Sequence, residues 1–137
     1  MTQRNIHGFA PMTLNGRILH SEVTGASNKE LGDIWFNEMK ETILSSPEKD
    51  TAPWALLIDC RNWGGGSLDS WEASNRSTDW MIDHNCVFGA IIVSNKVQHF
   101  AIETQVENQD VSHYFVDFDE AYKACLEKLA EAQSRQE

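Results

Sequence analysis

Residues whose types could do chemistry gather in one segment of this 137-residue chain, residues 59–71. The segment contains the thiol of Cys60, the guanidinium of Arg61 and the hydroxyls of Ser67 and Ser70. A glycine-rich turn that leads into a helix presents backbone N–H groups to anions, whereas thiols and hydroxyls are nucleophiles of covalent catalysis. The segment could therefore hold a ligand or an anion, or supply the nucleophile of an enzyme.

Three consecutive glycines, Gly64, Gly65 and Gly66, stand before Ser67 in the middle of this segment. One interpretation is an anion-binding nest of backbone N–H groups backed by a helix dipole. The other is a tight turn in which glycine only permits the backbone path. The pattern lacks the lysine of a phosphate-binding loop and the spacing of the dinucleotide fingerprint, so both interpretations remain open.

Four tryptophans flank the glycines: Trp54, Trp63, Trp71 and Trp80. Indole rings supply a large contact area together with a polar N–H group, which ligand pockets and interfaces favour. Trp54 begins an apolar run and is predicted to lie in the core. Trp63 and Trp71 stand on either side of the predicted turn, and we expect them to line a groove for a ligand or a partner.

Catalysis would require a base beside the nucleophile and a third group that orients the base. Cys60 or Ser70 could act as the nucleophile of a hydrolase, with His84, His99 or His113 as the base. The Gly-x-Ser-x-Gly pattern of the α/β-hydrolases is absent from the sequence. A hydrolase is therefore kept as an alternative, and the protein is not expected to be an enzyme.

Metal and cofactor sites are not predicted. His84 and Cys86 form one close pair of possible ligands, which falls short of the three or four that a zinc site needs. The cysteines, which include Cys60 and Cys125, are odd in number and lack the Cys-x-x-Cys spacing, so they are expected to be reduced.

Charge and composition limit the class of protein. Eleven Lys and Arg residues against 21 Asp and Glu residues give a formal charge of −10, which repels nucleic acid and anionic membranes. No apolar run approaches the roughly 20 residues of a membrane helix, and the first residues lack the apolar core of a signal peptide. We expect a cytoplasmic protein with one domain, residues 1–137.

The first half of the chain predicts a hairpin, a helix and a buried strand. Asn15-Gly16, a strong hairpin signal, lies between candidate strands at 9–14 and 17–23. Ser27-x-x-Glu30 resembles a capping box and begins a predicted amphipathic helix that reaches residue 44. The continuous apolar run at 54–58 is typical of a central strand covered on both faces.

The second half alternates helices and strands. A helix capped by Ser67 or Asp69 is predicted to reach about residue 84, with a wholly polar middle, so that Trp71, Trp80, Met81 and Ile82 alone look core-facing. Further elements are a strand at 87–93, a helix at 97–108 with Phe100, Ile102 and Val106 as its apolar positions, a strand at 113–116, and a final helix capped by Asp117.

The order β-β-α-β-α-β-α-β-α predicts an α/β sandwich. Its sheet should have four to five strands, mostly parallel, with the N-terminal hairpin as an antiparallel edge and helices around it. An exposed hairpin edge or the surface helices could pair two copies, so a homodimer is possible.

The residues resemble a known group, the STAS/SpoIIAA-like proteins, related in fold to anti-sigma factor antagonists. The resemblance rests on the hairpin, on the strand ending Leu57-Ile58-Asp59 before Asp69-Ser70, and on the segment 114–121 that begins the last helix. It implies a binding or regulatory role. In the antagonists a serine after an aspartate at this helix start is phosphorylated to break a partner interface, and Asp69-Ser70 is the matching pair.

This chain departs from the antagonists because Trp71-Glu72-Ala73 stand where they usually have a second serine and small residues including glycine. The SpoIIAA-like branch, akin to CRAL-TRIO domains and suspected of lipid or small-molecule binding, fits the tryptophans better. We therefore predict a non-catalytic protein that binds a small amphipathic or lipid-like ligand. The predicted site comprises Arg61, Trp63, Gly64, Gly65, Gly66, Ser67, Ser70 and Trp71. The first alternative is a protein-interaction module controlled by phosphorylation of Ser70 or Ser67.

Overall fold

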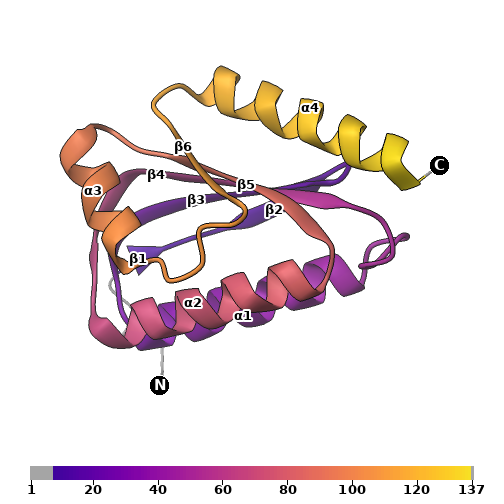
Figure 1. The fold of residues 1–137 in the computed structure, drawn as a ribbon. Helices are drawn as coiled ribbons and strands as arrows, with labels where there is room; N and C mark the ends of the chain where they lie inside the picture. Colours follow the sequence, from indigo (N-terminus) through magenta and orange to yellow (C-terminus); the bar gives the residue numbers. More distant parts are fainter. Residues whose placement is uncertain (1–7, 137) are drawn as a thin grey trace.

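The computed structural model describes residues 8–136, which fold in the predicted alternation of strands and helices (Figure 1). The elements are β1 (Gly8–Phe9), β2 (Met12–Asn15), β3 (Ile18–Ser27), α1 (Lys29–Leu44), β4 (Trp54–Gly66), α2 (Leu68–Asp83), β5 (Cys86–Ile92), α3 (Lys96–Gln105), β6 (Ser112–Phe115) and α4 (Phe118–Gln136). No helix within these residues is long and apolar enough to cross a membrane.

The strands form one sheet in the order β1-β3-β4-β5-β6. The short strand β2 also pairs with β3, at the start of β3, whereas β1 pairs near its end. Strands β3 to β6 are parallel, whereas β1 and β2 are antiparallel to β3, so the predicted architecture is confirmed. The sheet has more strands than expected because the predicted strand 9–14 is divided at Pro11. Proline has no N–H group for the ladder, although the carbonyl of Pro11 accepts a hydrogen bond from the amide of Glu22 (3.3 Å).

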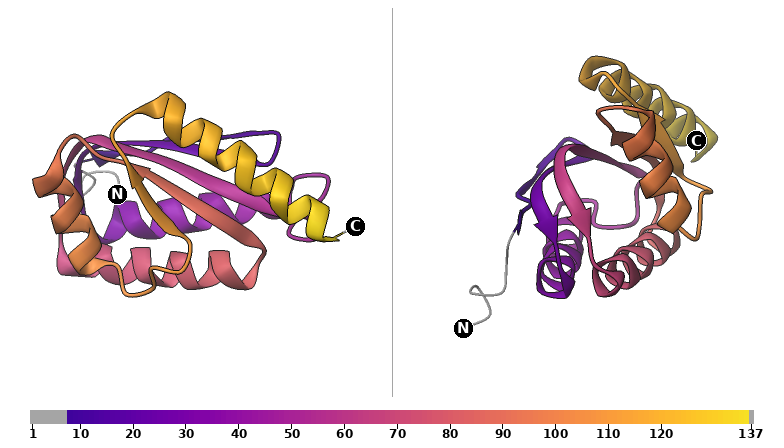
Figure 2. Two further views of the ribbon diagram at one scale, coloured as in Figure 1. Left: turned by 45° about the horizontal axis from the view of Figure 1, so that its top comes forward. Right: turned by 90° about the vertical axis from the view of Figure 1, so that its left-hand side faces the viewer.

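The helices form two layers. α1 and α2 lie side by side on one face of the sheet, α4 crosses the other face, and α3 stands at the end of the sheet where the parallel strands finish (Figures 1 and 2). Successive side chains of β4 serve opposite layers: Leu57 packs in the cluster with Ala121, Cys125 and Leu129 of α4, and Leu56 packs with Met39 of α1.

The start of α1 differs by one residue from the predicted capping box. Asn28 is the N-cap, because its side-chain oxygen accepts a hydrogen bond from the amide of Leu31 (3.0 Å). Ser27 remains in β3, paired in register with Gly66, and its hydroxyl accepts from Trp63 Nε1 (3.0 Å). Both residue types cap helices well, so the strand register decided between them.

The predicted glycine turn is wrong, because β4 continues through Gly66 and α2 starts after a single cap residue. Gly66 pairs with Ser27 of β3, and Gly64 and Gly65 lie at a shift in the register between the two strands. The amide of Ser67 extends the pairing by donating to the carbonyl of Ser27 (3.1 Å). Glycine is still needed there: Gly65 has a φ of 109°, and a Cβ at Gly64 would lie 3.3 Å from the carbonyl carbon of Gly25.

Helix α3 is shorter than predicted and is anchored by fewer side chains. Asn95 caps it, Ile102 is its buried residue, and Val106 follows its last turn. Phe100, one of the three apolar positions of the predicted helix, does not face the core, because 71% of this residue is exposed. Asp117 accepts a hydrogen bond from the amide of Glu120 (3.0 Å) at the start of α4, as its position predicts.

Candidate functional site: a cavity beneath α2

The sheet-facing side of α2 consists mainly of small residues. Ser70, Ala73, Ser77, Thr78 and Met81 are buried, and they recur at the three- and four-residue spacing of one helix face. The prediction that only the large apolar residues of this helix face the core is therefore wrong.

The cost of burying these hydroxyls is offset by hydrogen bonds within α2 itself. Ser77 Oγ donates to the carbonyl of Ala73 (3.0 Å), and Thr78 Oγ1 donates to the carbonyl of Ser74 (3.1 Å). Ser70 Oγ donates in the same way to the carbonyl of Ser67 (2.8 Å). Each hydroxyl proton is thus satisfied locally, which is how serine and threonine are tolerated on a buried helix face.

Small side chains leave space between α2 and the sheet. A cavity of about 160 Å³ lies there, partly open to solvent, and α1, α3 and the segment after α3 complete its wall. α1 and α2 approach closely, since a Cβ at Gly32 would lie 2.9 Å from Cβ of Ala73. The lining residues are Ala10, Val23, Ser27, Leu31, Gly32, Trp35, Leu56, Ile58, Cys60, Trp63, Ser70, Trp71, Ser74, Ser77, Thr78, Met81, Cys86, Gly89, Ile91, Ile102, Val106, Val111 and Ser112.

An irregularity in β4 places both Cys60 and Trp63 in this wall. Strict alternation would send residues an odd number apart to opposite faces of a strand. Glu22 of β3 pairs with Asp59 of β4, but Thr24, two residues later, pairs with Asn62, three residues later. β4 therefore carries one extra residue at this point. Such a bulge re-aims the following side chains, and Trp63 joins Cys60 on the cavity side.

Trp63 and Trp71 meet at one end of the cavity. Their rings are perpendicular, with an interplanar angle of 84° and centroids 5.5 Å apart, which is a favourable edge-to-face arrangement. Both line the cavity, and Trp35 also contributes to the wall. The ring nitrogen of Trp63 donates to Ser27 Oγ (3.0 Å) and that of Trp35 donates to Ser21 Oγ (2.9 Å).

The other residues of the predicted site lie outside this wall. Gly64, Gly66 and Ser67 are exposed along the end of β4 and the start of α2, and Gly65 is half-buried there. Arg61 is not a lining residue. Of the residues singled out in the sequence, the structure brings Trp63, Ser70 and Trp71 together around the cavity, with Cys60 beside them.

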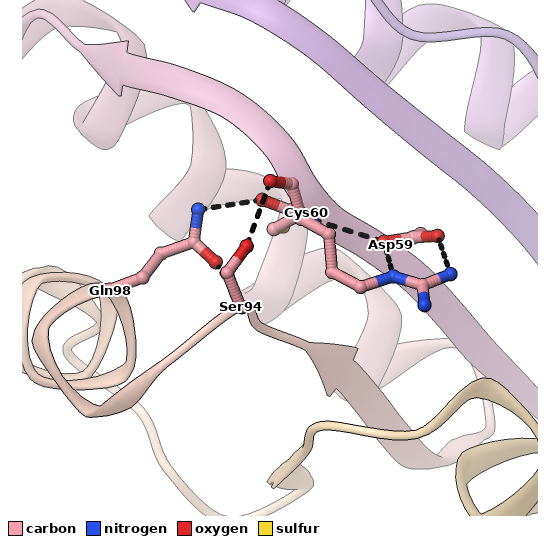
Figure 3. Close-up of polar contacts among 5 residues, drawn as sticks. Asp59, Cys60, Ser94 and Gln98 are labelled. Carbon is pink, nitrogen blue, oxygen red and sulfur yellow. Dashed lines mark hydrogen bonds and ion pairs between the residues drawn. The ribbon is translucent and has the colours of Figure 1, made fainter.

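Arg61 is engaged by its neighbour Asp59 (Figure 3). Its Nε lies 3.0 Å from Asp59 Oδ1 and its Nη2 lies 2.7 Å from Asp59 Oδ2, a two-pronged ion pair. Burial by itself would raise the pKa of Asp59, but the hydrogen bonds and charge of Arg61 outweigh it and lower the pKa. A guanidinium held in this way is a poor anchor for an external anion.

The carbonyls next to this ion pair tie β4 to the start of α3 (Figure 3). Ser94 Oγ donates to the carbonyl of Arg61 (2.9 Å), and Gln98 Nε2 donates to the carbonyl of Cys60 (2.7 Å). Gln98 in turn accepts from the amide of Ser94 (2.7 Å). These bonds hold α3 against the strand that forms the floor of the cavity.

The geometry gives little support to a hydrolase. Burial, and to a smaller extent the Asp59 carboxylate, raises the pKa of the Cys60 thiol to about 12, so it stays protonated at neutral pH. Each of the three histidines considered as bases stacks on another ring: His84 on Trp80, His99 on Tyr114 and His113 on Phe88. Within residues 8–136, no group of three or more His, Cys, Asp or Glu side chains is placed to hold a metal ion.

Of the comparisons with family models, curated proteins and solved structures, only the last found similar proteins. No family model matches the sequence, and no curated protein matches it. Among solved structures, an uncharacterized protein of the DUF3478 family with a SpoIIAA-like fold, from Shewanella loihica PV-4, has a TM-score of 0.60 at 17% identity over 86% of this chain and 93% of its own. An anti-sigma factor antagonist from Mycobacterium paratuberculosis has a TM-score of 0.62 at 12% identity over 87% and 94%.

The fold is SpoIIAA-like. The resemblance inferred from the order of the elements is therefore confirmed at the level of the fold. Within this SpoIIAA-like fold, Asp69 and Ser67 are exposed at the start of α2. Ser70 is buried, with only 7% of its surface exposed, and its side chain faces inward. A Cβ at Gly66 would lie 2.7 Å from Ser70 Oγ, so this hydroxyl packs closely against the end of β4.

Sequence reasoning missed most of the cavity wall, in particular Leu31 and Trp35 of α1 and the hydroxyl face of α2. A signal was present, because Ser70, Ala73 and Ser77 recur at helical spacing as small residues instead of large apolar ones. Small residues in such a stripe indicate either close helix contact or unfilled space, and only the position of the sheet distinguishes the two.

Proposed function

We propose that the protein is a non-catalytic STAS-type regulatory module that binds a small amphipathic ligand in the cavity beneath α2. The observation that carries the proposal is the cavity of about 160 Å³, lined largely by apolar atoms and reaching Trp63 and Trp71 at the start of α2. Protein interiors are otherwise close-packed, and voids of this size are few.

The volume limits the ligand. An apolar cavity of roughly 150 Å³ binds a molecule the size of benzene, so this one suits a single substituted ring or a short branched chain. A long acyl chain would not fit inside it.

The regulatory part of the proposal draws on the fold: one similar structure is named an anti-sigma factor antagonist, a name that implies a protein partner.

Binding to the cavity predicts stabilisation by small apolar molecules. Toluene and indole are suitable probes, with tryptophan fluorescence and thermal unfolding as readouts. At ten times its Kd, a probe that binds only the folded state stabilises it by about 1.4 kcal/mol. The fluorescence should change with the same midpoint, because Trp35, Trp63 and Trp71 line the cavity.

A pair of variants localises the effect. Ser74→Leu places a large side chain in the cavity wall and should abolish probe binding, whereas Ser134→Leu makes the same change on the exposed surface of α4 and should leave it intact. Equal binding of the probes to both variants, or no binding to the wild type, would contradict the proposal. Native mass spectrometry of protein purified gently from its host then identifies the natural ligand by its mass.

A further inference from the structure

The cavity wall carries no charge. All its lining residues lie within residues 8–136, and none of them is Asp, Glu, Lys, Arg or His. The chain as a whole is rich in such residues, with 11 Lys and Arg, 21 Asp and Glu and five His. An ionised group transferred into such a cavity would lose its hydration without gaining a counter-ion.

Three hydroxyls of the α2 wall are left with acceptor capacity only. Ser70, Ser77 and Thr78 each donate their single hydroxyl proton to a carbonyl of α2, which leaves their oxygen lone pairs as the remaining capacity. The indole N–H groups of Trp35 and Trp63 are already bound to serine hydroxyls and are not available to a ligand.

Ser70, Ser77 and Thr78 lie on the α2 side of the cavity, and the side chains that face them from the sheet are largely apolar. Ser70, Ser77 and Thr78 come from α2, whereas Leu56, Ile58 and Ile91 come from the sheet. A ligand that fills this space therefore meets the three acceptors of α2 on one side and mainly hydrocarbon on the other. It gains most when its own donor points toward α2.

From these observations we infer the ligand class: a neutral, ring-sized molecule with one hydrogen-bond donor, such as a phenol, an aromatic alcohol or an indole. This inference rests on the proposed function and specifies the ligand of the same cavity. Carboxylates, including fatty acids, are excluded by the uncharged wall. Purely apolar rings fit by size but leave the α2 acceptors without a partner.

The test compares phenol, toluene and benzoate in wild type and in two threonine variants. Thr78→Val removes a hydroxyl from the cavity wall while keeping the shape of the side chain. Thr104→Val is the matched control, because Thr104 Oγ1 likewise donates to the carbonyl four residues earlier (Phe100, 2.7 Å), but on the exposed surface of α3.

We expect Thr78→Val to weaken phenol binding about three- to tenfold and to leave toluene binding unchanged or tighter, since one hydrogen bond to a buried acceptor is lost. Ser77→Ala should act in the same direction, and it guards against a rearranged cavity in the valine variant. Thr104→Val should change neither affinity. Benzoate should bind at least tenfold more weakly than phenol to every variant.

The outcomes separate this inference from the proposed function. If neither phenol nor toluene binds to the wild type, the cavity is not a ligand site and both fail. If toluene binds but the α2 variants change its affinity and that of phenol by the same factor, the ligand site stands and the donor preference is overturned. Binding of benzoate as tight as that of phenol would overturn the requirement for a neutral ligand.

Discussion

The two faces of the sheet are covered in contrasting ways. Against α4, buried apolar residues fill the layer: Ala121, Cys125 and Leu129 of the helix pack on Leu57 and its neighbours. Against α2, the helix turns serines and a threonine toward the sheet, and a cavity remains. The same strands thus support a sealed structural layer on one side and a hollow one on the other, and the hollow layer is the part of the molecule suited to binding.

Adjacent leucines of β4 test the contrast most strongly. Leu57→Ala empties a closely packed site on the α4 face and should lower the free energy of unfolding by about 3–5 kcal/mol. Leu56→Ala enlarges a cavity that already exists and should cost about 2 kcal/mol, near the transfer free energy alone. Urea denaturation of both variants measures the difference. Equal losses would mean that the α2 face is as tightly packed as the α4 face.

Aspartate substitutions at the start of α2 separate its inward and outward serines. Ser70→Asp introduces a charge at a buried position and should destabilise the protein by about 2–4 kcal/mol, even with the helix dipole in its favour. Ser67→Asp keeps a good N-cap in an exposed position and should change stability by less than about 0.5 kcal/mol. Chemical denaturation compares the two. A Ser70→Asp protein as stable as the wild type would show that this helix start opens easily, and would reopen the phosphorylation alternative.

Enlarging one residue in each layer should change the stability of the protein in opposite directions. Cys125→Leu overpacks the α4 layer and should cost about 1–3 kcal/mol, because Cys125 is completely buried. Ser74→Leu fills space under α2 and should stabilise by about 1 kcal/mol. Thermal unfolding of the two variants measures both changes in stability. Destabilisation by both would indicate that α2 cannot accommodate more volume.

The smallest expected effect concerns the ion pair beside the cavity floor. The folded state lowers the pKa of Asp59 below its usual 3.8, so the pair stabilises the protein above about pH 4 and this contribution is lost as the pH falls through the lowered pKa. After allowance for the exposure of Arg61, Arg61→Gln should cost about 1 kcal/mol at pH 7.

The difference between wild type and Arg61→Gln should shrink as the pH falls from 6 to 3, because the unpaired, buried Asp59 of the variant then becomes protonated. Urea titrations at several pH values measure it, with Arg135→Gln on the exposed end of α4 as the control. A difference that does not vary with pH would indicate that Arg61 stabilises the protein by packing and not by charge.

Sequence patterns succeeded where a single periodicity governs an element. The hairpin at Asn15-Gly16, the amphipathic α1, the apolar strands β4 and β5 and the cap of α4 all follow from local rules, and they suffice for the fold. The site was predicted less completely. Trp63 and Trp71 were expected beside a ligand because of their types and positions, and the structure places both in the cavity wall. The predicted glycine turn is wrong, because β4 continues through Gly66, which pairs with Ser27 of β3.

The sequence by itself determined the alternation of elements, because this depends on residue spacing and on turn chemistry within a few residues. The parallel sheet followed from that alternation, because strands separated by helices are joined by crossovers. Only the tertiary structure decided that Ser70, Ser77 and Thr78 face inward and that space remains beneath them. The reason is physical: a hydroxyl that bonds to its own helix is compatible with water or with the core, and the choice between them depends on what the rest of the fold brings against that face.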